Sequence, residues 1–231
     1  MNGSGGEHEE DIQIALEASG VQRTPCILVL DTSGSMGANG RIERLNEGLK
    51  AFEHSIRSDE TLCQQVLLMV IGFGTTVQML CDWTQGDSFT APLLQASGMT
   101  AMGQAMTLAH SATEEIRHDL QSRGIPMTRP WIFLMSDGGP NDDGWQEAAA
   151  KSRAACENRR AVVWPIAVPP DADGSALKAF ARSNMNVYSI GTDANFTAIF
   201  EWLSTSLGAI SNSSSGQMIE VEQPTKIVVE V

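Results

Sequence analysis

Three segments of the sequence carry oxygen-bearing side chains next to apolar runs. DTSGSMG begins at Asp31 and places Ser33 and Ser35 at alternate positions; SGMTAMG contains Thr100; SDGGPND contains Asp137. Carboxylate and hydroxyl oxygens are ligands of hard divalent cations, and Mg²⁺ takes them in near-octahedral geometry while it keeps several waters. These residue types predict a Mg²⁺ site, with Mn²⁺ or Ca²⁺ as alternative ions.

The spacing also predicts what such an ion would do. Side chains two residues apart lie on one side of an extended segment, so we expect Asp31, Ser33 and Ser35 to share a side of an extended loop. Together with Thr100 and Asp137 they would fill up to five positions, directly or through water, and leave the sixth open. An ion held mainly by neutral hydroxyls keeps much of its charge. The prediction is a site that binds an incoming carboxylate.

The apolar pattern predicts the elements that position these side chains. CILVL, QVLLMVIGFG, WIFLMS and AVVWPIAVP are continuous apolar runs typical of buried parallel strands, TTVQMLCDW predicts an antiparallel edge strand, and NVYSI a sixth strand. Helical spacing is expected over residues 42–56, 100–120, 142–159, 175–182 and 196–210. We therefore expect a three-layer, Rossmann-like α/β fold with a mostly parallel six-stranded sheet, one antiparallel edge strand and helices on both faces. Ligands of such sheets bind at the carboxyl ends of the strands.

The length and composition favour one folded domain. The 231 residues are 42% hydrophobic and 19% charged, which is enough to bury a core. We expect a tail or cap over residues 1–22, the domain over 23–212, and a linker with a short β-prone tail over 213–231.

The cysteines and the apolar runs predict a cytoplasmic protein. The four cysteines are far apart and form no CxxC pair, so they are expected to be small buried hydrophobes in a reducing compartment. The first twenty residues do not resemble a signal peptide, and no apolar run approaches the ~20 residues that span a bilayer. We expect no membrane partner.

The charge narrows the class of partner. A net charge of −13 with a pI near 4.6 argues against nucleic acid, because neutralising phosphates requires a basic face. Divalent cations or basic protein surfaces are favoured.

The combination of DTSGS, the threonine of SGMT and the SDG after the fourth apolar run resembles the metal-ion-dependent adhesion site of von Willebrand factor type A (vWA) domains. The alternating elements from Pro25 to about Ile210 resemble that fold. The segments VLLMVIGFGTTV, DSFTAPLLQASGMTAMGQAM and WIFLMSDGGPNDDGW further resemble the bacterial TerY-like branch, whose stand-alone cytoplasmic domains accompany tellurite-resistance and related stress systems. Two positions depart from the common pattern, Met99 and Ser136, and neither removes a metal oxygen.

The resemblance implies binding rather than catalysis. It implies Asp31, Ser33, Ser35, Thr100 and Asp137 as the metal set, and protein partners that offer an Asp or Glu, including protein kinases and PP2C-type phosphatases. The rim that meets the partner is predicted to comprise Met36, Met99, Asp142 and Trp145.

Alternative readings concern both the function and single residues. In one alternative, the metal serves only to join the loops, and the tail after Gly216 binds the partner. A Mg²⁺-dependent aspartyl phosphatase is disfavoured, because Ser33 stands where a second, acid/base Asp is needed. We expect Asp142 to cap the helix that begins near it rather than reach the ion. His110 and His118 are expected to be solvated.

Overall fold

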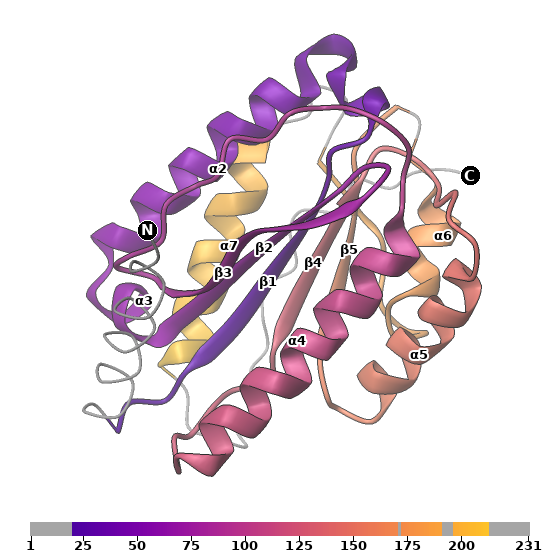
Figure 1. Ribbon diagram of the computed structural model, residues 1–231. Helices are drawn as coiled ribbons and strands as arrows, with labels where there is room; N and C mark the ends of the chain where they lie inside the picture. Colours follow the sequence, from indigo (N-terminus) through magenta and orange to yellow (C-terminus); the bar gives the residue numbers. More distant parts are fainter. Residues whose placement is uncertain (1–19, 171, 191–195, 213–231) are drawn as a thin grey trace, which may run out of the picture.

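The computed structural model describes residues 20–170, 172–190 and 196–212 and contains one six-stranded sheet between two layers of helices (Figure 1). The sheet order is β3-β2-β1-β4-β5-β6, and only the pairing of β3 with β2 is antiparallel. The strands are β1 Thr24–Asp31, β2 Val66–Phe73, β3 Val77–Gln85, β4 Trp131–Ser136, β5 Val162–Ala167 and β6 Tyr188–Ser189. The predicted fold class is confirmed, including the antiparallel edge strand.

The helices cover both faces of the sheet, as Figure 1 shows. They are α2 Arg41–Ser58, α3 Glu60–Gln65, α4 Met102–Ser122, α5 Trp145–Glu157, α6 Gly174–Ala179 and α7 Phe196–Ser211, with a 3₁₀ segment, η1, over Gly34–Gly40. None of the helices in the described ranges is both long and apolar enough to cross a bilayer.

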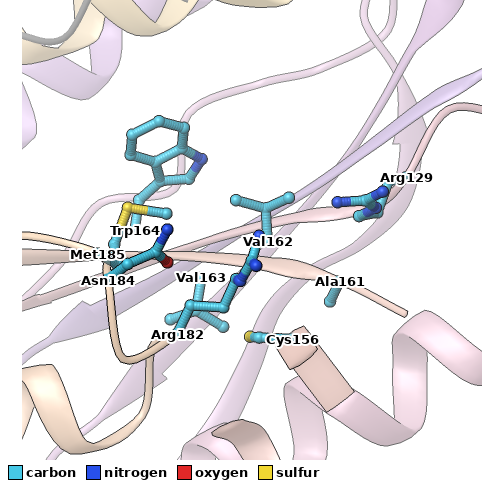
Figure 2. A pocket seen from close by; sticks show the side chains of 9 residues that line it. All are labelled: Arg129, Cys156, Ala161, Val162, Val163, Trp164, Arg182, Asn184 and Met185. Atoms are coloured by element: carbon cyan, nitrogen blue, oxygen red, sulfur yellow. The ribbon is translucent and has the colours of Figure 1, made fainter. Parts of the chain in front are cut away.

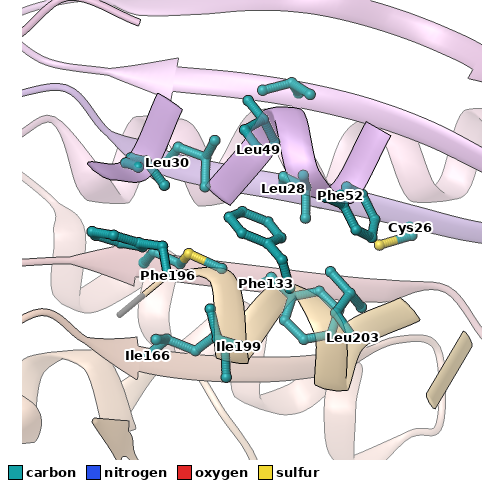
Figure 3. Close-up of a cluster of buried hydrophobic side chains, with 14 of the residues drawn as sticks. Cys26, Leu28, Leu30, Leu49, Phe52, Phe133, Ile166, Phe196, Ile199 and Leu203 are labelled. Carbon is teal, nitrogen blue, oxygen red and sulfur yellow. The ribbon is translucent and has the colours of Figure 1, made fainter. Parts of the chain in front are cut away.

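Alternate residues of the central strand β1 enter two separate cores. Cys26, Leu28 and Leu30 pack with residues of α2 and α7, such as Phe52 and Phe196, in the cluster drawn in Figure 3. Ile27 and Val29 face the opposite layer, formed by α4, α5 and α6. All eight residues of β1 are buried, which explains its unbroken apolar run.

The order of the strands creates one point where a ligand can bind. From β1 the chain proceeds to β2 and β3 on one side, and then returns to β4 on the other side of β1. The carboxyl ends of β1 and β4 therefore flank the position where the strand order reverses, which is where open α/β sheets bind ligands. Asp31 ends β1, and Asp137 directly follows β4.

Several sequence-based expectations need correction. The loop after Asp31 is extended only as far as Ser33, because Gly34–Gly40 winds into η1 and Ser35 lies in a helical turn. Helix α3 was not expected, and β6 is reduced to two residues. The predicted tails lie largely outside the described residues, which leave out 1–19 and 213–231.

His110 is partly buried rather than solvated. Its Nε2 lies 2.8 Å from the Ser152 Oγ, and the Ser152 hydroxyl in turn donates to the Phe180 carbonyl at 2.6 Å. Because that carbonyl uses the hydroxyl hydrogen, the imidazole Nε2 must donate to Ser152. Burial lowers the pKa of His110 to about 4, against the nearby charge of Glu114. The neutral histidine thus joins α4, α5 and the end of α6.

Candidate metal centre

Backbone hydrogen bonds join the loop after β1 to the loop before α4. The Gly34 amide donates to the Gly98 carbonyl at 3.0 Å, and the Ser97 amide donates to the Thr32 carbonyl at 2.8 Å. Gly98 has a φ of +79°, and a Cβ there would lie 2.1 Å from the Thr75 Oγ1, so only glycine fits. This turn fixes the loop that carries Thr100.

Two hydrogen bonds join Thr100 to the loop after β4. The Thr100 amide donates to the Asn141 Oδ1 at 2.9 Å, and the Asn141 amide donates to the Thr100 carbonyl at 3.1 Å. Thr100 itself is buried. Its position is therefore set through its backbone, and Asn141 is a positioning residue that the sequence reasoning missed.

A continuous set of polar contacts connects the first and third loops. The Ser33 and Ser35 hydroxyl oxygens are 2.9 Å apart, and the Ser35 hydroxyl donates to the Asp137 Oδ1 at 2.7 Å. The Ser35 hydroxyl therefore links the Asp137 carboxylate to the Ser33 hydroxyl. The fold brings Asp31, Ser33, Ser35, Thr100 and Asp137 to the same three joined loops.

Asp31 is fully buried and lacks a cationic partner among the described residues. Its Oδ1 accepts from the Ser33 amide at 2.7 Å, and its Oδ2 accepts from the Ser136 hydroxyl. Burial raises the pKa of the Asp31 carboxyl, and the nearby Asp137 raises it further, against the hydrogen bonds from Ser136 and Ser33. Burying a charge without a counter-ion is costly, so this carboxylate is suited to a bound cation.

Arg41, like Asn141, is a residue of these loops that was not predicted from the sequence. Its guanidinium forms an ion pair with the Asp137 Oδ2, and its side chain is only 3% exposed. A signal was present, because Arg41 begins α2 and a positive charge at a helix N-terminus opposes the helix dipole. Of the two buried carboxylates, Asp137 is paired with this guanidinium, whereas Asp31 has no cationic partner in the part of the chain that the structure describes.

The donor set fits a hard cation. Two hydroxyls and the Asp137 carboxylate are in contact here, Asp31 accepts from the Ser33 amide, and Thr100 lies in the neighbouring loop. No group of three or more His, Cys, Asp or Glu side chains that could hold a metal occurs within the described part of the chain. Oxygen-only sets suit Mg²⁺, Mn²⁺ or Ca²⁺.

The four predicted rim residues differ in accessibility. Met99 is 55% exposed beside Thr100, whereas Met36 is fully buried in the core because η1 turns its side chain inward, so its rim assignment is corrected. Trp145 is half-buried, with its ring centroid 6.3 Å from that of Phe180. It contributes to the core between helices.

Asp142 caps α4 instead of the helix that follows it. Its two carboxylate oxygens accept from the Gly103 amide at 3.1 Å and the Gln104 amide at 2.9 Å. The N-cap of α5 is Gly144, which provides no side-chain cap. The expectation that Asp142 caps its own helix is wrong, because the loop folds back over the first turn of α4.

Replacing Asp142 with alanine should lower the free energy of unfolding by about 1 kcal/mol, as the loss of an N-cap does. Asp143→Ala, at the exposed neighbouring position, is the matched control and should change it by less than about 0.5 kcal/mol. Urea denaturation measures both. Equal losses in the two variants would show that the cap contributes nothing.

The fold and these loops define a class of protein: a doubly wound α/β domain with oxygen-bearing side chains in the loops at the reversal of strand order. Residues 26–139 match the family model of the von Willebrand factor type A domain. The matched stretch is just under half of the chain; it runs from β1 to the loop after β4 and includes the five residues predicted to hold the metal. No protein of the curated set matches the chain in sequence.

Solved structures share this fold at low sequence identity. A von Willebrand factor type A protein from Catenulispora acidiphila is 16% identical over 81% of this chain and 43% of its own, with a TM-score of 0.64. The vWF domain of the pilus tip protein Mfa5 from Porphyromonas gingivalis is 13% identical, with coverages of 85% and 99% and a TM-score of 0.61.

A third structure, proximal thread matrix protein 1 from the mussel byssus, has a zinc-occupied MIDAS motif. It is 14% identical over 81% of this chain and 48% of its own, with a TM-score of 0.54. The present chain spans less than half of the length of the Catenulispora and byssus proteins.

Proposed function

We propose that this domain binds a protein partner through a divalent cation, Mg²⁺ in the first instance, held by Asp31, Ser33, Ser35, Thr100 and Asp137. The observation that carries the proposal is the buried Asp31 carboxylate, which has no cationic partner among the described residues and accepts from the Ser33 amide, while the Ser33 hydroxyl contacts that of Ser35, which in turn donates to Asp137. When bound, the cation would supply a positive charge with one position for a partner's Asp or Glu.

The surroundings of the centre support recognition rather than structural closure alone. Gly34, Ser35 and Met99 are exposed, so a partner can approach the loops from solvent. The chain carries a net charge of −13, which repels an acidic partner elsewhere on the surface. Binding should therefore depend on the cation or on basic residues around the partner's carboxylate.

The first test is a Mg²⁺ titration followed by thermal unfolding. An ion that binds only the folded state stabilises it by about 2.7 kcal/mol at a hundredfold excess over Kd, so Tm should rise. Ser33→Ala should abolish most of that rise, while Ser97→Ala, at an exposed position of the second loop, should keep it. A Tm that does not change on addition of Mg²⁺, Mn²⁺ or Ca²⁺ would refute the metal site.

The second test separates recognition from scaffolding. Affinity capture from the native cell should retain a partner in Mg²⁺ and lose it in EDTA or with Ser33→Ala. A partner retained in EDTA by Ser33→Ala would instead favour docking through the tail after Gly216, which lies outside the described residues. We expect no turnover of an aryl phosphate with Mg²⁺, and turnover that Asp31→Asn abolishes would favour the phosphatase alternative.

The finer assignment concerns the cellular system. We infer a TerY-like role in a tellurite-resistance or stress system, in the cytoplasm, with a kinase or PP2C-type phosphatase as partner. The resemblance of VLLMVIGFGTTV and WIFLMSDGGPNDDGW supports it. Identification of the captured protein tests it.

A further inference from the structure

A pocket of about 200 Å³ (Figure 2) lies at the amino ends of the strands, opposite the end of the sheet that carries the candidate metal centre. It is bounded by residues 161–164 at the start of β5, by Arg129 just before β4, by Cys156 near the end of α5 and by Arg182, Asn184 and Met185 after α6. These segments sit at the amino ends of the strands, whereas Asp31 and Asp137 lie at the carboxyl ends.

The cavity is positively charged in an otherwise acidic protein. Burial lowers the pKa of Arg129, and the positive charges of Arg159, Arg182 and Arg117 lower it further. Within the described residues, the side chains of Arg129, Arg159 and Arg182 form no ion pair with a carboxylate. Such mutual repulsion is relieved when an anion binds. Glu157 lies near this group, and its carboxylate accepts from the Ser183 hydroxyl.

A buried donor without a partner lines the same cavity. Trp164 is only 6% exposed, and its indole Nε1 has no hydrogen-bond partner among residues 20–170, 172–190 and 196–212. Buried indole N–H groups usually find an acceptor. Asn184 adds an amide to the lining, and Figure 2 shows the Arg182 side chain extending from the same turn toward Val162. The cavity thus offers two guanidinium groups and an amide, next to a buried indole.

We propose that this cavity binds the phosphate group of a monoester, contributed by a phosphorylated side chain or by a small phosphate ester. Guanidinium groups bind phosphate oxygens through two parallel hydrogen bonds, and a dianion matches two unpaired arginines. The site binds rather than cleaves. Burial raises the pKa of Cys156, so this thiol stays protonated and is no nucleophile.

The test follows the Trp164 indole N–H by NMR on ¹⁵N-labelled full-length protein, with EDTA present so that the metal centre does not contribute. Trp164→Phe assigns the signal. Titration with phenyl phosphate, and with a phosphothreonine peptide, should shift this signal in a saturable way, whereas chloride at equal ionic strength should not. If the phosphothreonine peptide binds at least tenfold more tightly than phenyl phosphate, the natural ligand is a phosphorylated protein side chain. Equal affinities would indicate a small phosphate ester.

Arginine variants make the outcome specific. Arg129→Gln combined with Arg182→Gln should weaken phosphate binding at least tenfold, and lysine at both positions should give intermediate affinity. Arg57→Gln combined with Lys50→Gln is the control with a matched charge change, because both residues lie on α2, outside this cavity. An unshifted indole signal, an equal response to chloride, or unchanged affinity in the double glutamine variant would overturn the proposal.

Discussion

Replacing Asp137 with alanine is expected to lower the free energy of unfolding by about 3–5 kcal/mol, measured by urea denaturation without divalent ions. The reason is that Arg41 is almost completely buried and Asp137 is its ion-pair partner. Removing the carboxylate leaves a desolvated guanidinium uncompensated and removes the acceptor of the Ser35 hydroxyl.

The double variant Arg41→Met with Asp137→Ala is the control. It removes both charges, and a buried ion pair replaced by apolar side chains often costs little stability. We expect it to recover at least half of the loss caused by Asp137→Ala. If the double variant is no more stable than Asp137→Ala, the unpaired Arg41 charge does not account for the stability lost in Asp137→Ala.

Arg41→Met alone should lower the stability of the metal-free protein and increase the stabilisation that Mg²⁺ provides. Without metal it leaves both Asp31 and Asp137 uncompensated, so the protein should be less stable than the native protein. With Mg²⁺ it should show a larger rise in Tm, because Arg41 no longer competes for Asp137. A smaller Mg²⁺ response in Arg41→Met would show that Arg41 supports the ion instead of competing with it.

Asp31→Asn is expected to leave the metal-free protein at least as stable as the native one, while it reduces Mg²⁺ affinity on the order of 100-fold. Within the described ranges the buried carboxylate has no counter-ion, so removing its charge removes a cost of folding. The asparagine Oδ1 can still accept from the Ser33 amide. Its amide can donate to the Ser136 hydroxyl, which lies 3.1 Å from the Gly138 carbonyl and can donate there.

Thermal unfolding and calorimetric Mg²⁺ titration measure the two effects separately. Asp31→Ala, which cannot accept from Ser33, should lose metal binding and also stability. If Asp31→Asn keeps Mg²⁺ affinity within about threefold of the native value, Asp31 does not serve the proposed site. If it is markedly less stable without metal, the carboxylate has a structural role.

The strands could be predicted because their burial leaves a direct trace in the sequence. β1, β2 and β4 are buried throughout, so each is an unbroken apolar run. Helix α3 left only a weak signal, because six residues are too few for periodicity. Its start is marked by Asp59, whose carboxylate accepts from the Thr61 and Leu62 amides.

The residues proposed to hold the metal were recognisable from their types, whereas the residues that position them were not. Asp137 follows a strand and is a natural candidate, whereas Arg41 reaches it across 96 positions of the chain and became apparent only in the folded structure. The same holds for Asp142, which caps a helix that begins 40 residues earlier in the chain. Such contacts depend on how loops fold over one another, which periodicity does not encode.

The placement of the two proposed sites has a consequence for assembly. Strands β4 and β5 pair along six residues each, and this length separates the two edges of the sheet by roughly 20 Å. A molecule held at the arginine-lined edge would not collide with one held at the carboxyl edge. The domain could therefore bridge two molecules in a ternary complex, from which a chelator would release one and leave the other attached.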